Sequence, residues 1–476
     1  MRGGRCLRIC CPTRLTTKCF VSFLFAVTTL AGAANVDWIL TARIAVTMDA
    51  RRRVIEDAAV AVRGDRILAV GTRAAIDKEH RAAQRLDAGN ALLAPGLVNT
   101  HTHAAMSLFR GIADDVRLQE WLEKFIFPAE SRNVSPEFVR WGTRLACLEM
   151  LLSGTTTFTD MYYFEEVVGE VAREAGMRGV LGQTVIGFPV ADAKTPAEGL
   201  ARAERFLKQF DGDPLVTPAV APHAIYTNSD ATLGAARALA NRHRKPLLIH
   251  LSETKKENDD VRRARGVSPA RALDALGLWN GRAVAAHGVW LDDTDIEILA
   301  ARGVGVAHCP ASNMKLASGI APVVKLLKAG VAVGLGPDGP AGSNNDFDLW
   351  EEMDLAGKLA KVHSGDPAAL TSRQIVEMAT IGGARALGLD GETGSIEPGK
   401  RADILIAALD HPRTTPFYDV YSLMVWAMKG SDVRHVMVNG KLVVRDRKPL
   451  TLDSAAILKK ALEYRGSVAA SLRTGR

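Results

Sequence analysis

The chain has 476 residues, which is enough for two to four ordinary domains or for one large barrel with an attached module. Apolar residues make up 47% and charged residues 24%, a composition that excludes a disordered chain and a polytopic membrane protein. The net charge is +7, but residues 1–33 carry five basic side chains and no acid, so the remaining 55 basic and 53 acidic groups nearly balance and a broad nucleic-acid-binding surface is excluded.

Residues 1–33 have the pattern of a secretory signal peptide. Basic residues are spread from Arg2 to Lys18, an apolar run extends from Cys19 to Leu30, and Ala31-Gly32-Ala33 forms a small-x-small cleavage site. An uncleaved membrane anchor is the alternative, but the apolar run is shorter than the roughly 20 residues that a spanning helix needs. We therefore expect cleavage after Ala33, export to the periplasm, and no membrane attachment afterwards.

Both ends of the remaining chain are rich in short β-forming runs. Residues 34–95 contain Arg63-Gly64-Asp65-Arg66, a hairpin signal between two alternating runs, and residues 391–450 contain the tight-turn dipeptide Asn439-Gly440. We predict that the two segments form one small β-sandwich domain. Residues 451–476 are predicted to form a C-terminal helix.

Residues 96–390 alternate between apolar strand candidates and helical stretches, which is typical of parallel βαβ units. Eight such units over this length match a (β/α)8 TIM barrel, and an open doubly wound sheet is the alternative. The strand candidates are Leu97–His103, Thr155–Met161, Gly179–Ile186, Leu215–His223, Pro246–Glu253, Ala283–Leu291, Val304–Cys309 and Val331–Gly336.

Histidines gather where these strands end, which is the face on which barrel active sites are built. His101 and His103 stand two apart on one strand, so both side chains point to the same side. His250 ends the fifth strand and Asp338 follows the eighth. Three imidazoles and one carboxylate at one barrel mouth indicate a metal site. No lysine ends the fourth strand in the place of a carboxylated bridge between two ions, which favours a single ion.

Further polar residues at the same end can reach this site. Glu253 lies three residues past His250, close enough to reach water at the metal without being a ligand. His287 and His223 end the sixth and fourth strands and can point into the same cavity. The alternatives are a solvated loop acid for Glu253 and a hydrogen-bonded structural histidine for His223 and for His308.

Six further segments of the sequence are distinctive: "PGLVNTHTHAAMSLFRG" (95–111), "WLEKFIFPAE" (121–130), "HLSET" (250–254), "AHGVWL" (286–291), "HCPASNMKLASGIAP" (308–322) and "DGPAGSNND" (338–346). Together they resemble the amidohydrolase superfamily, and within it the 5-methylthioadenosine/S-adenosylhomocysteine deaminase branch beside the triazine chlorohydrolases. The resemblance extends from about Val36 to the C-terminus, with the segments in order and at fitting spacings.

The resemblance implies that His101, His103, His250 and Asp338 hold one divalent metal ion, zinc. It implies that Asp338 accepts the proton of the attacking water, that Glu253 moves protons to the substrate, and that His287 sits against this water. Glu130 and His223 would contact the substrate, Glu130 through ribose hydroxyls. Gln183 stands where relatives can carry an arginine suited to a substrate carboxylate, so we expect neutral substrate tails to be preferred.

The activity implied is hydrolytic deamination of an aminopurine nucleoside or related amino-heterocycle, with release of ammonia. Hydrolysis of another leaving group from an electron-poor ring, such as chloride, is the rival among enzymes, because the same residues serve both reactions. An exported, non-catalytic binding protein is the rival from another class. The expected partner is a small-molecule substrate, and no nucleic-acid partner is expected. Association into a homo-oligomer is left open.

Overall fold

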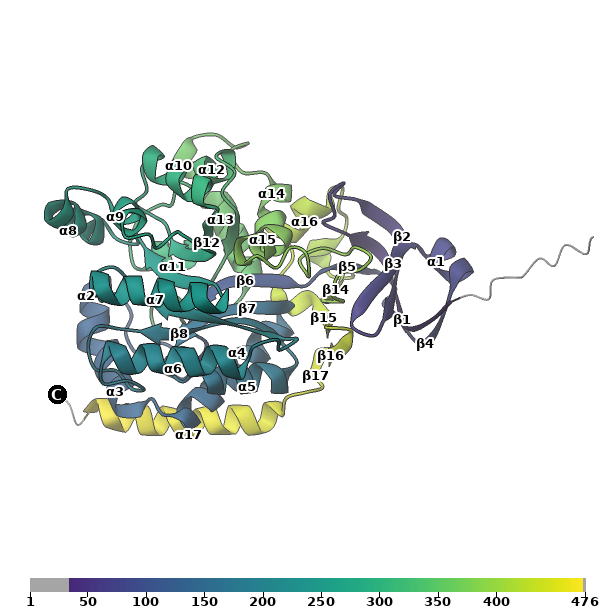
Figure 1. The fold of residues 1–476 in the computed structure, drawn as a ribbon. Helices are drawn as coiled ribbons and strands as arrows, with labels where there is room; N and C mark the ends of the chain where they lie inside the picture. Colours follow the sequence, from purple (N-terminus) through teal and green to yellow (C-terminus); the bar gives the residue numbers. More distant parts are fainter. Residues whose placement is uncertain (1–33, 474–476) are drawn as a thin grey trace, which may run out of the picture.

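The computed structural model describes residues 34–473, and the predicted signal peptide lies outside them. Two bodies are visible in Figure 1: a barrel surrounded by helices, and a twisted sheet packed beside it. The sheet contains strands from both ends of the described chain, in purple and in yellow-green, whereas the barrel is built from the residues between them (Figure 1).

The barrel is closed and consists of eight parallel strands, in the order β10-β11-β12-β13-β6-β7-β8-β9. All eight predicted strands are present, and the predicted (β/α)8 fold is confirmed. The strands are β6 (Leu97–Thr102), β7 (Thr155–Tyr162), β8 (Arg178–Val185), β9 (Val216–Pro222), β10 (Leu247–Leu251), β11 (Ala283–His287), β12 (Gly305–His308) and β13 (Val333–Leu335).

Several strands end earlier than their apolar runs suggest. The run from Ala283 continues to Leu291, but β11 stops at His287, where the backbone turns into the left-handed region with φ of 73°. Apolar character persists past this point because Val289 is buried beyond the strand. Hydrophobic runs therefore locate these strands well and their ends less well.

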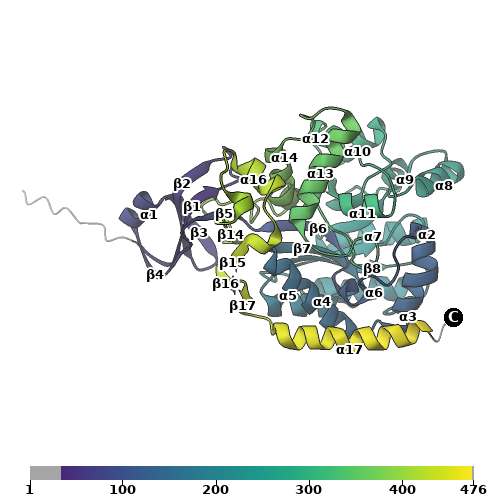
Figure 2. The same cartoon turned by 180° about the vertical axis from the view of Figure 1, so that it is seen from behind.

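Helices connect the strands and cover the outside of the barrel (Figures 1 and 2). Three of them begin with a serine or threonine cap followed by proline at the first helical position, a strong start signal: Ser135 before α4, Thr195 before α6 and Ser268 before α9. The principal covering helices are α4 (Pro136–Leu152), α5 (Glu165–Ala175), α6 (Pro196–Gln209), α7 (Asp230–His243), α8 (Lys255–Arg265), α9 (Pro269–Ala275), α10 (Asp293–Arg302), α12 (Val323–Lys328), α13 (Leu349–Ser364), α14 (Ser372–Glu377) and α15 (Gly383–Leu387).

The second body is a nine-stranded sheet, in the order β17-β16-β15-β14-β5-β1-β2-β3, with β4 also paired to β1. The two chain ends meet where β5 and β14 pair in antiparallel fashion, with Pro95 opposite Ile404. The strands are β1 (Ala34–Val46), β2 (Val54–Arg63), β3 (Arg66–Thr72), β4 (His80–Asp87), β5 (Ala91–Pro95), β14 (Ile404–Ala408), β15 (Val433–Val438), β16 (Lys441–Arg445) and β17 (Lys448–Pro449).

Both predicted hairpin turns are present in this sheet. Arg63 pairs with Arg66 across a two-residue turn, and Val438 pairs with Lys441 around Asn439-Gly440. Asn439 and Gly440 both have positive φ, as a type I′ turn requires. The sheet curls back on itself, because β3 meets the segment just before β14 through the bridge between Arg66 and Arg401, and it encloses its own apolar core.

The two bodies are joined by a buried ion pair. Arg178, at the start of β8, donates to Asp403, which immediately precedes β14, with an Nε–Oδ2 distance of 2.9 Å. The last helix, α17 (Ser454–Arg473), lies along the outside of the barrel against α3 (Phe127–Asn133) and α4 (Figures 1 and 2). Within residues 34–473, no helix combines the length and apolar character needed to cross a membrane.

Candidate metal and catalytic site

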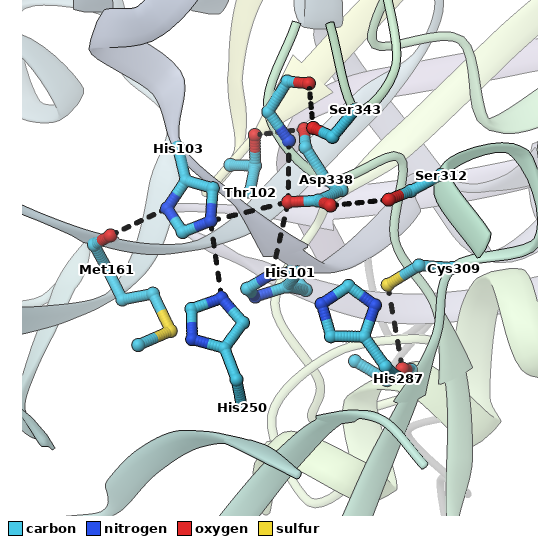
Figure 3. A network of polar contacts seen from close by, with 12 residues as sticks. His101, Thr102, His103, Met161, His250, His287, Cys309, Ser312, Asp338 and Ser343 are labelled. Atoms are coloured by element: carbon cyan, nitrogen blue, oxygen red, sulfur yellow. Dashed lines mark hydrogen bonds and ion pairs between the residues drawn. The ribbon is translucent and has the colours of Figure 1, made fainter. Parts of the chain in front are cut away.

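Four potential metal ligands meet at the carboxyl ends of three barrel strands (Figure 3). His101 and His103 come from the end of β6, His250 from β10, and Asp338 from the segment that follows β13. Asp338 Oδ1 lies 3.3 Å from Nε2 of His101 and 3.3 Å from Nε2 of His103. The Nε2 atoms of His103 and His250 are 3.4 Å apart. The structure therefore brings together the four residues that the sequence predicts as metal ligands.

These spacings fit a tetrahedral zinc ion. Four ligands about 2.0–2.1 Å from such an ion lie about 3.4 Å from one another, and three imidazole nitrogens with one carboxylate are a donor set that zinc accepts. Nε2 of His101 is buried without a hydrogen-bond partner, which leaves a lone pair for an ion. Burial also lowers the pKa of His101 to about 4, so its ring is neutral, as a ligand must be.

Backbone carbonyls orient two of the imidazoles. Nδ1 of His103 lies 2.8 Å from the carbonyl oxygen of Met161, and Nδ1 of His250 lies 2.9 Å from that of His223. Each ring donates its Nδ1 proton outward, so its Nε2 faces the other ligands, which is the usual arrangement around a bound metal (Figure 3).

Two residues of the short helix α11 (Pro310–Lys315) hold other side chains of the site. The hydroxyl of Ser312 donates to Oδ2 of Asp338 over 2.6 Å, and Nδ1 of His287 lies 3.1 Å from Oδ1 of Asn313. Asp338 and His287 both have left-handed backbones, with φ of 65° and 73°. Strained backbone of this kind is concentrated where a structure places functional groups.

Glu253 and His287 stand next to each other beside the ligands. Oε2 of Glu253 is 3.8 Å from Nε2 of His287, and both residues are buried. Burial, with the nearby Asp338 carboxylate, raises the pKa of Glu253 to about 8, so this carboxyl group holds a proton at neutral pH. One ring nitrogen of His287 also lies within 4.8 Å of ring nitrogens of His101 and His250, close enough for the three to share a metal ion.

A cavity opens above the ligands, and Glu130 lies on its wall. The cavity is lined by His103, His250, His287, Asp338, Glu253, His223 and Glu130, together with Trp121, Phe127, Tyr162, Tyr163 and Tyr226 among its aromatic residues. The hydroxyl of Tyr162 donates to one Glu130 oxygen over 2.7 Å, and that of Tyr163 to the other over 3.4 Å. Burial raises the pKa of Glu130 to about 7, against the effect of the Tyr162 hydrogen bond.

His223 lines the cavity, whereas Gln183 does not. The His223 ring packs 4.6 Å from that of His250, and its Nδ1 contacts the Thr227 hydroxyl. Gln183 is fully buried behind the wall, where its amide donates to Asp192 and to the Thr184 carbonyl and accepts from the Glu165 amide. A role for Gln183 in contacting a substrate tail therefore has no support in the geometry.

Some residues of the site were not singled out from the sequence. Ser312 and Asn313 lie in the segment 308–322 that carries the family resemblance, and their position directly after β12 was a usable signal. Tyr162 ends β7 and Tyr163 follows it, but nothing in their spacing indicates that they donate hydrogen bonds to Glu130. His308 is buried and lies outside this cavity, consistent with a structural role.

The chain matches known proteins over most of its length. Residues 92–443 match the model of the Amidohydrolase family, and the chain belongs to this family. It is 46% identical, over 439 residues, to 5-methylthioadenosine/S-adenosylhomocysteine deaminase 1 of Syntrophus aciditrophicus strain SB; the match covers 92% of this chain and 99% of that protein. The predicted resemblance is confirmed.

Two solved structures extend the comparison. An adenosine deaminase from Xanthomonas campestris with bound zinc is 39% identical, with a TM-score of 0.89, covering 92% of this chain and 99% of that one. The atrazine chlorohydrolase of Arthrobacter aurescens, complexed with zinc, has a TM-score of 0.83 over 90% of this chain and all of its own. At 24% identity, the second likeness shows the fold alone.

Proposed function

We propose that this chain is a metal-dependent hydrolase that deaminates an aminopurine nucleoside and releases ammonia. One observation carries the proposal: a compact set of metal ligands lies directly beside the buried carboxyl group of Glu253, at the base of an aromatic cavity. The relatives named as deaminases of 5-methylthioadenosine, S-adenosylhomocysteine and adenosine support the choice of substrate class.

His101, His103, His250 and Asp338 would hold a single zinc ion. When bound, such an ion acts as a Lewis acid that lowers the pKa of water to near neutrality. Two observations support this assignment. Nε2 of His101 has no hydrogen-bond partner among the described residues, and the Nδ1 atoms of His103 and His250 are held by backbone carbonyls, so that their Nε2 atoms face the site.

The surrounding side chains supply the proton transfers. Asp338 accepts a proton from the water that attacks the ring carbon bearing the amino group. Glu253 gives its proton to the adjacent ring nitrogen, takes up the remaining proton of the added water and passes it to the departing amine, so that ammonia leaves and the ring keeps the oxygen. The proton that Asp338 accepted then returns to Glu253. His287, whose Nδ1 donates to Asn313 Oδ1 and whose pKa is lowered by burial, presents Nε2 as an acceptor toward the same point as Glu253, where it accepts a hydrogen bond from the attacking water and orients it.

The opposite wall of the cavity suits the sugar of a nucleoside. Glu130 presents carboxylate oxygens whose positions are fixed by two tyrosine hydroxyls, and such oxygens accept hydrogen bonds from vicinal hydroxyls. His223 lines the same cavity and packs against the ring of His250. The two residues therefore match the substrate contacts that the family resemblance implies.

A small adjoining cavity can take the substituent at the other end of the sugar. It shares Phe127, Glu130 and Tyr163 with the main cavity and is otherwise lined by Ser131 and the run from Phe188 to Ala191. No lysine or arginine lines either cavity in the described part of the chain. The preference for a neutral tail thus rests on this apolar lining, and Gln183 has no part in it.

Ammonia release from purified, zinc-loaded protein tests the proposal. The panel comprises adenosine, 5′-methylthioadenosine, S-adenosylhomocysteine, guanine, an amino-triazine and a chloro-triazine, with chloride measured for the last. We expect release from the adenosines. Chloride release without deamination would favour the rival hydrolase, and binding of adenosines without turnover would favour a binding protein.

A further inference from the structure

The backbone that carries Glu253 is held in an unusual conformation. Ser252, just before it, has a left-handed φ of 49°. The Ser252 carbonyl accepts hydrogen bonds from the amides of Val289 and Trp290 at 3.1 and 2.9 Å, so this side of the loop is tied to the segment that follows His287. A non-glycine residue in this region is strained and persists only where its surroundings hold it.

The other side of the same loop is held by a buried carboxylate, Glu257. This residue lies in the first turn of α8 and is 6% exposed. Its Oε1 accepts from the Ser252 amide at 3.0 Å, and its Oε2 accepts from the Glu253 amide at 2.9 Å. No lysine or arginine within residues 34–473 forms an ion pair with it. The two amides are therefore its hydrogen-bond partners.

The start of α8 does not explain this arrangement. Thr254 already caps the helix, because its hydroxyl accepts from the Glu257 amide at 3.1 Å. In a capping box, a glutamate at this position returns to the amide of the cap residue itself. Here the carboxyl group contacts the Thr254 amide and also reaches past it to the two preceding amides, one of which belongs to Glu253.

We propose that Glu257 is a positioning residue for catalysis: by binding the amides of Ser252 and Glu253, it fixes the peptide that aims the Glu253 carboxyl group into the cavity beside His287. The inference rests on the proposed function, in which Glu253 transfers protons. Proton transfer depends on a heavy-atom separation near hydrogen-bond length, so a small rotation of this peptide removes much of the benefit.

The test is a double-mutant cycle between Glu257→Gln and Glu253→Gln, with Thr254→Ala as the matched control. Glu257→Gln replaces one acceptor oxygen by an NH₂ group that faces an amide donor. We expect it to lower kcat about 10- to 100-fold, part of the usual contribution of general acid–base catalysis, because the Glu253 carboxyl group is then aimed less accurately, with KM changed less than about threefold. Zinc content, measured by elemental analysis, should be unchanged.

Epistasis separates positioning from general loosening of the fold. Glu253→Gln alone should lower kcat about 10²- to 10⁴-fold, the usual contribution of general acid–base catalysis, and adding Glu257→Gln should lower it little further. Thr254→Ala removes the helix cap but leaves both amide bonds, so it should lower the melting temperature while kcat stays within about threefold of wild type.

Two results would overturn the inference: a kcat for Glu257→Gln no lower than that of Thr254→Ala, or an equal effect of Glu257→Gln with and without Glu253. Should Glu257→Gln fail to fold, Glu257→Asp gives the same cycle, because its carboxylate keeps the charge but is too short to reach both amides. Failure of the proposed function looks different: wild type releases no ammonia from any aminopurine, or Glu253→Gln is fully active.

Discussion

The hydroxyl of Ser312 donates a 2.6 Å hydrogen bond to Oδ2 of Asp338, which leaves Oδ1 of the same carboxylate facing His101 and His103 (Figure 3). The protein holds both oxygens, because Oδ1 also accepts from the Gly339 amide at 2.7 Å, but only Oδ1 faces the ligand nitrogens. These hydrogen bonds fix the plane of the Asp338 carboxylate, which is proposed both to bind the metal ion and to accept a proton.

Replacing Ser312 by alanine should therefore impair turnover. The change leaves a buried carboxylate oxygen without its donor, which costs about 1.5–3 kcal/mol and corresponds to a fall in kcat of about 10- to 100-fold. Steady-state kinetics with 5′-methylthioadenosine measure it. Ser343→Ala is the matched control, since Ser343 donates to the Gly339 carbonyl rather than to Asp338. Equal effects of the two substitutions would contradict the assigned role.

Removing one ligand should remove the metal. His250→Ala deletes an imidazole whose Nε2 lies 3.4 Å from that of His103. We expect zinc content to fall well below one ion per chain and ammonia release to fall with it, because three remaining ligands bind the ion more weakly. Elemental analysis after dialysis against a mild chelator provides the measurement. A His250→Ala protein with full zinc and full activity would show that the site lies elsewhere.

The tail preference can be altered at Phe188, which lines the small adjoining cavity and is partly exposed. Wild type should favour 5′-methylthioadenosine over S-adenosylhomocysteine by about tenfold or more in kcat/KM, since the cavity offers a carboxylate no cation. Phe188→Arg supplies one and should raise the relative kcat/KM for S-adenosylhomocysteine about tenfold. Adenosine, which has no such tail, is the control. An unchanged ratio would place the tail elsewhere.

The link between barrel and sheet should matter for stability rather than catalysis. Arg178→Met leaves Asp403 as a buried charge without its cation, although Thr393 and the Asn439 amide still donate to it. Breaking a buried pair in this way costs about 3–5 kcal/mol. Urea unfolding should show this loss, whereas kcat/KM of the folded protein should match wild type. A loss of activity without a loss of stability would contradict this division.

Export is a prediction from residues 1–33 alone. The mature protein should begin at or near Ala34 and be recovered from the periplasm, because the small-x-small site follows an apolar run of signal-peptide length. Mass spectrometry of the purified protein and fractionation of cells measure both points. Intact Met1 on protein from the cytoplasm would contradict it.

Strand ends and their histidines were predictable because parallel strands place their carboxyl ends at one mouth, so His101, His103, His250 and Asp338 had to converge once the eight strands were recognised. Glu253 followed from its spacing to His250. Gln183 was misplaced, because it was assigned from the place of an arginine in relatives, whereas here its amide is buried behind the cavity wall and bonded to Asp192 and to the Thr184 carbonyl.

The positioning residues were less accessible to sequence reasoning. Ser312 acts through one hydrogen bond to a group 26 residues away, and Glu257 through two to amides four and five residues away. A serine or a glutamate at a helix start ordinarily indicates no more than a cap. Only the left-handed turn at Ser252 brings the Glu253 amide within reach of Glu257, and backbone torsions of this kind leave no mark on residue type.

The pairing of β5 with β14 has a consequence for how the chain acquires its structure. Pro95 and Ile404 are partners separated by about 300 residues, a long loop whose closure is costly in entropy and slow. Folding of the barrel reduces this entropic cost. Because β6 begins at Leu97 and α15 ends at Leu387, a folded barrel brings the two parts of the sheet close together. The sheet can then form across the short segments that connect β5 to β6 and α15 to β14. Any substitution that delays closure of the barrel should therefore delay formation of the sheet as well.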